Sequence, residues 1–180
     1  MKYAGLALKL AFLSYLGYLW FFLATSYEPA VSGYSPPVVI FVLDIINLFI
    51  HEAGHFIFKL FGMWVHIGGG SLFQCLIPLS LLVVTWRENR NHVVYPAFWL
   101  GENLVNVSAY IQDAPVRKLK LIAKGLIHDW HWLLRGNLEM AEPLATTVFI
   151  TGLVVCAAAI ALGLFAAVQA FRDRVGGVDG

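Results

Sequence analysis

The chain has 180 residues, enough for one domain; 59% of them are hydrophobic and only 13% are charged, against about 45–50% and about 25% in soluble domains. With a mean hydropathy of +0.74, this composition excludes an ordinary soluble domain and favours a protein surrounded by lipid. The net charge of +1 gives no reason to expect a nucleic-acid partner, and two cysteines are too few for a disulfide framework or a four-cysteine zinc site.

The N-terminal half contains two long apolar runs. The first, about 4–25, follows Lys2 and is longer than the apolar part of a signal peptide, so we expect it to be retained as a helix. A loop with several helix-breaking residues covers 26–37, and the second run covers about 38–61. Three consecutive glycines then predict a turn or an irregular stretch over 62–71.

The C-terminal half contains three further apolar runs, at about 72–86, 93–110 and 144–171. Between the last two lies a polar connection, in which apolar and basic residues alternate at helical spacing over 117–135, as in a helix that lies in the membrane interface. The sequence therefore predicts an all-α, polytopic membrane helix bundle in one domain, 1–180. It has about five transmembrane helices and one interfacial amphipathic helix, and membrane lipid is its first expected partner.

The second apolar run carries a metal-binding motif. Asp44, Asn47, His51 and His55 follow one another at steps of three, four and four, which places them on one face of a helix. Polar side chains at membrane depth are costly unless they line a cavity, pair or bind an ion. Two histidines one turn apart can bind one zinc ion, and Glu52 beside them is the expected general base of a hydrolase.

His51-Glu52-Ala53-Gly54-His55 within a transmembrane helix, followed by a glycine-rich stretch, resembles the site-2-protease family of intramembrane zinc metalloproteases. The resemblance implies that His51 and His55 bind zinc, that Glu52 is the general base, and that a distant carboxylate completes the site. The family's third ligand lies in a Leu-Asp-Gly context, which this chain lacks; its nearest counterpart is 100–103, which includes Glu102. The chain also resembles small uncharacterised bacterial membrane proteins that carry the same motif.

A catalytic zinc takes three protein ligands and a water, so a third ligand must come from elsewhere in the chain. We rank His128 first, because imidazole is a common zinc ligand and the next residue could orient the site. Asp129, Asp113 and Glu102 are the other candidates.

The leading hypothesis is an intramembrane zinc-dependent hydrolase, a metalloprotease of the bacterial inner (cytoplasmic) membrane that acts on membrane-protein substrates. Two alternatives stay open. One is a non-catalytic, metal-containing accessory subunit that packs against other subunits of a membrane complex. The other is a non-hydrolytic metal protein, in which His51, His55, His128 and His131 all bind metal.

Overall fold

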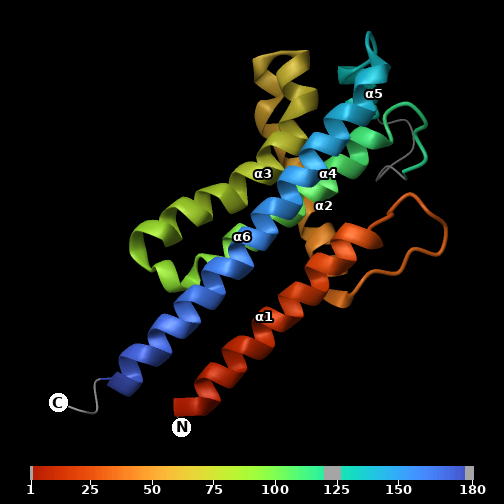
Figure 1. The fold of residues 1–180 in the computed structure, drawn as a ribbon. Coiled ribbons are helices and arrows are strands. Elements are labelled where there is room, and N and C mark those ends of the chain that lie inside the picture. The colour runs from red at the N-terminus through yellow and green to blue at the C-terminus, as the bar shows by residue number, and fades with distance from the viewer. Residues whose placement is uncertain (1, 120–126, 177–180) are drawn as a thin grey trace.

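The structure is a computed structural model that describes residues 2–119 and 127–176, and this part of the chain is helical without strands (Figure 1). Short 3₁₀ segments lie at Lys59–Phe61, Arg90–His92 and Leu138–Met140. The α-helices, in chain order, are α1 (Lys2–Thr25), α2 (Val38–Phe58), α3 (Met63–Glu88), α4 (Val94–Gln112), α5 (Asp129–Leu133) and α6 (Ala141–Gly176).

Within the described residues, four helical segments are long and apolar enough to cross a membrane: Tyr3–Thr25, Val38–Phe61, Met63–Glu88 and Leu138–Asp173. The structure thus supports a helical bundle compatible with a membrane protein, with four candidate spans where the sequence predicted about five. The difference is α4, which occupies the place of the span predicted at 93–110 but is not one of the four.

Helix α4 lies inside the bundle. Most of its residues are buried, including Glu102, Asn103 and Asn106, and two of these bond to other helices, Glu102 to α2 and Asn106 to α3. It packs most extensively against α6, and α1 runs along α6 on another side (Figure 1). The helices α1, α4 and α6 share one apolar core, to which α1 contributes four leucines at helical spacing, Leu13, Leu16, Leu19 and Leu23.

Helices α2 and α3 form a second packed pair, and here the prediction of a break over 62–71 is wrong. Only Gly62, with a φ of +89°, forms the turn, and α3 begins at the next residue. The three glycines lie inside α3, and α2 packs tightly against Gly69 and Gly70: a Cβ atom on Gly69 would lie 2.7 Å from the Cβ of Phe58. Helix contacts therefore override the weak helix propensity of glycine.

The amphipathic helix predicted over 117–135 is not found as one continuous element in the described residues. Residues 120–126 of it lie outside the described part of the chain. Residues 117–119 are not helical, and Arg117 has a φ of +56°. The described helix in this region is α5, five residues that begin directly after His128.

Candidate metal centre

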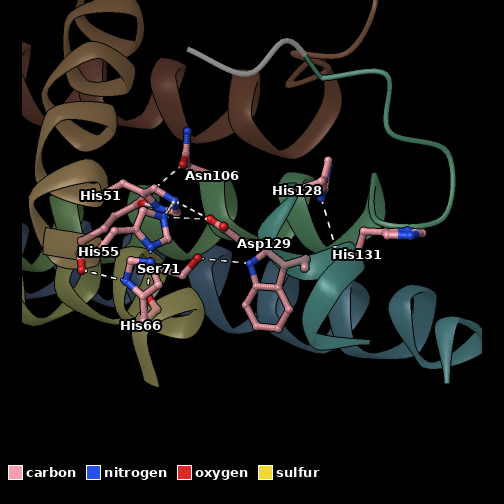
Figure 2. Close-up of polar contacts among 10 residues, drawn as sticks. His51, His55, His66, Ser71, Asn106, His128, Asp129 and His131 are labelled. Atoms are coloured by element: carbon pink, nitrogen blue, oxygen red, sulfur yellow. Dashed lines mark hydrogen bonds and ion pairs between the residues drawn. The ribbon is translucent and has the colours of Figure 1, made fainter. Parts of the chain in front are cut away.

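Three side chains from two distant helices converge at one point. Helix α2 contributes His51 and His55, whose Nε2 atoms are 3.1 Å apart. Helix α5 contributes Asp129, whose Oδ2 atom lies 2.8 Å from Nε2 of His51 and 3.1 Å from Nε2 of His55 (Figure 2). The side chains of His51, His55 and Asp129 are only 12%, 17% and 16% exposed. These atoms are close enough together to hold one metal ion.

The other nitrogen of each imidazole has its own partner. Nδ1 of His55 lies 2.9 Å from the backbone oxygen of His66, and because a carbonyl oxygen only accepts, Nδ1 carries the proton. Nδ1 of His66 in turn donates to the backbone oxygen of His55, at 2.9 Å. Nδ1 of His51 lies 3.1 Å from Oε1 of Gln74 on α3. This arrangement leaves both Nε2 atoms free to bind a metal, as is usual when a ligating histidine donates from its other nitrogen.

The charge at this point favours a cation. Burial raises the pKa of the Asp129 carboxyl, but its hydrogen bonds with His51 and His55, together with the electrostatic effect of these two residues, outweigh burial and hold the pKa below its ordinary value. The carboxylate is therefore ionised at neutral pH and brings a negative charge to the two imidazoles. Three acceptor atoms within about 3 Å of one another repel unless a proton or a metal ion lies between them.

His128 and Asp113, two other candidates for the third ligand, contact each other instead. Nε2 of His128 lies 3.1 Å from Oδ2 of Asp113, and both side chains are buried. Nδ1 of His128 accepts from the backbone N–H of His131, so Nε2 carries the proton and donates to Asp113. The geometry therefore favours Asp129 as the third ligand over His128, which the sequence ranked first. His128 directly precedes α5, and its side chain points away from His51 and His55 (Figure 2).

Glu102, the remaining candidate, belongs to a separate set of contacts. Its Oε2 accepts a hydrogen bond of 2.8 Å from Asn47, whose Oδ1 accepts one of 2.9 Å from the indole of Trp99. Its Oε1 has no hydrogen-bond partner among the described residues, and the side chain is completely buried. Glu52 follows His51 on α2 and is partly buried; it is not one of the three residues that converge.

The short helix α5 is attached to the first turns of α3, and this attachment places Asp129. The indole of Trp130 donates to Oγ of Ser71, at 3.1 Å. The guanidinium of Arg135 lies 3.8 Å from the ring centre of Trp132 and 5.3 Å from that of Trp64, a geometry that favours cation–π attraction. Sequence reasoning missed Gln74, His66 and these aromatic contacts. Gln74 alone left a signal, as a polar residue within an apolar run.

No family model matches the chain, and no curated protein and no solved structure was found that matches it. The resemblance to the site-2-protease family therefore stays a prediction that rests on the motif at His51–His55.

Proposed function

We propose that this chain is a zinc-dependent hydrolase of the membrane that cleaves peptide bonds in membrane-protein substrates. The observation that carries the proposal is the convergence of two imidazole nitrogens and one carboxylate oxygen from α2 and α5. We extend the proposal to the bacterial cytoplasmic membrane on the resemblance of the motif alone.

The donor set fits zinc. Zinc–nitrogen and zinc–oxygen bonds of about 2.0–2.1 Å in tetrahedral geometry put two donor atoms roughly 3.3 Å apart. The three donor pairs are 2.8, 3.1 and 3.1 Å apart, so a small outward movement of the side chains accommodates the ion. Two nitrogens and one oxygen would supply three protein ligands, the number found in catalytic zinc sites.

The residues of the chain then have separate roles. A bound zinc ion supplies Lewis acidity, which lowers the pKa of a water in the open position. His51, His55 and Asp129 would hold the ion, and Glu52 would accept a proton from the water and deliver it to the leaving amine. The ring of Tyr110 is stacked beside that of His51, with centres 6.2 Å apart and planes inclined by 21°.

The decisive experiment measures zinc per chain and peptide hydrolysis in detergent for the wild type, His51→Ala and Glu52→Gln. We expect about one zinc in the wild type and in Glu52→Gln, none in His51→Ala, and hydrolysis by the wild type alone. Glu88→Gln, which changes an exposed glutamate at the end of α3, is the matched control and should behave as the wild type. A wild type without zinc, or an active Glu52→Gln, would overturn the assignment.

A second candidate function is a structural metal site in an accessory subunit of a membrane complex. The low exposure of the three side chains, 12–17%, favours it, because it leaves little room for a substrate to approach. In this case Glu52→Gln would retain zinc and change nothing else, and the chain would co-purify with other subunits.

A further inference from the structure

A continuous series of hydrogen bonds leads from the metal centre to the loop between α1 and α2. Beyond the contact of His51 with Oε1 of Gln74, Nε2 of Gln74 lies 2.7 Å from Oδ1 of Asn106. Nδ2 of Asn106 lies 2.9 Å from Oδ1 of Asp44 and 2.8 Å from the hydroxyl of Tyr27. That hydroxyl donates to the same oxygen of Asp44, at 2.7 Å. Gln74 and Asn106 are both buried, at 2% and 7% exposure.

The accepting oxygen of Asp44 at the far end sets the direction of every hydrogen bond in the series. Oδ1 of Asp44 accepts from both Tyr27 and Asn106, so Asn106 presents its NH₂ group to Asp44 and its oxygen to Gln74. Gln74 must then present its NH₂ group to Asn106 and its oxygen to His51. The proton of His51 is thereby required on Nδ1.

Tyr27 supports this direction. Burial, followed by the negative charges of Asp44 and Glu102, raises the pKa of its phenol well above the ordinary value. The phenol is therefore neutral and donates to Oδ1 of Asp44, which shows that this oxygen is the accepting end of the series.

We propose that Gln74, Asn106 and Asp44 are positioning residues of the metal centre, which hold the proton of His51 on Nδ1 and so present Nε2 to the metal. That the position of this proton matters for metal binding rests on the proposed function, whereas the position itself does not. In the metal-free protein, the contact of Nε2 with Asp129 at 2.8 Å by itself favours the opposite arrangement, with the proton on Nε2. The hydrogen-bond series thus predicts a proton on Nδ1 of His51, whereas the contact with Asp129 predicts a proton on Nε2.

The first test reads the proton directly. The ¹⁵N chemical shifts of histidine are measured in metal-free protein at about pH 9, well above the ordinary pKa of imidazole, and His51→Gln identifies the signals of His51. We expect a protonated Nδ1 in the wild type and in Gln74→Glu, and a proton on Nε2 in Gln74→Met. An unprotonated Nδ1 in the wild type would overturn the proposal.

The second test measures zinc affinity by competition with a chelator. Gln74→Met removes the acceptor without much change of volume, and we expect the affinity to fall by about 10- to 100-fold, as for other outer partners of metal ligands. Gln74→Glu offers an oxygen to Nδ1 whether or not the carboxyl is protonated, so it should stay near the wild-type value.

Asn106→Leu and Asn103→Leu form a matched pair on α4, because both remove a buried amide, but among the described residues Asn103 bonds only to the backbone oxygen of Trp99. We expect Asn106→Leu alone to lose affinity; circular dichroism and size-exclusion chromatography confirm that each variant folds. Equal losses in both asparagine variants, or in both Gln74 variants, would show a merely structural role and overturn the proposal. If the wild type binds no zinc, the proposed function fails, while the ¹⁵N measurement still decides the position of the proton.

Discussion

Gly70 of α3 faces His51 at the metal centre, and a Cβ atom on this glycine would lie 2.6 Å from Nε2 of His51. The same Cβ atom would lie 2.7 Å from Nε2 of His55. Real Cβ atoms essentially never approach other heavy atoms this closely, so a side chain at this position and the observed imidazoles exclude each other. The space at the centre of the site depends on the absence of a side chain from α3.

We therefore expect Gly70→Ala to displace the imidazoles and abolish zinc binding, measured as zinc per chain. Gly68→Ala is the matched control, since its Cβ atom would meet no other atom within 4 Å. In the middle of a helix that change should stabilise the protein by about 0.5–1 kcal/mol. If Gly70→Ala bound zinc as well as Gly68→Ala does, the ion would have to lie elsewhere.

A second prediction distinguishes Asp129 from its neighbour. Asp129→Ala should lose zinc, because it removes the oxygen that lies 2.8 Å from Nε2 of His51. His128→Asn should retain zinc, since asparagine is a good residue to begin a helix and can replace the contact of His128 with the backbone N–H of His131. Isothermal titration with zinc measures both, and the reverse order of affinities would restore His128 as the third ligand.

A third prediction concerns the attachment of α5 to α3. Trp130→Phe and Ser71→Ala each remove the same hydrogen bond, and each should destabilise the protein by about 1 kcal/mol. The double variant should be no less stable than the less stable of the two single variants. Thermal unfolding of the three variants and the wild type measures this. Additive losses would mean that the two side chains act independently.

A fourth prediction concerns the bundle core. Helices α4 and α6 approach closely at Gly101, where a Cβ atom would lie 2.7 Å from the backbone oxygen of Gly152. Backbone cannot move aside as a flexible side chain can, so Gly101→Ala should destabilise the protein by about 1–3 kcal/mol. Gly17→Ala on α1, where a Cβ atom meets nothing within 4 Å, is the control; equal thermal stability of the two variants would contradict the observed packing.

Local patterns predicted the helical class and the ends of the first two helices well. The loop expected at 26–37 separates α1, which ends at Thr25, from α2, which begins at Val38. The glycines 68–70 misled the prediction because their effect depends on a neighbour: without α2 they weaken a helix, and beside α2 they permit close packing. The hydrophobic run at 93–110 was equally ambiguous, since an apolar helix can face lipid or the other helices of a bundle.

The candidate site was predictable only where it is local. His51 and His55 lie one helical turn apart, and spacing alone brings them together. Asp129 comes from a helix whose position depends on Trp130, Ser71 and the aromatic contacts of Arg135, none of which a linear pattern reveals. His128 and Asp129 are adjacent, and the course of the backbone at the start of α5 decides which of the two side chains reaches His51 and His55. Residue type alone does not reveal this.

The separation of the ligands along the chain has a consequence for unfolding. His55 and Asp129 are 74 residues apart, so an ion held between them closes a large loop and reduces the entropy of the unfolded chain. The bundle has two parts. The helices α2, α3 and α5 form the part that contains both ends of this loop, and the helices α1, α4 and α6 form most of the apolar core. With the ion bound, the two parts should unfold together. After chelation, amide hydrogen exchange should become faster in α2 and α5 than in α4 and α6, and a single cooperative transition should separate into two.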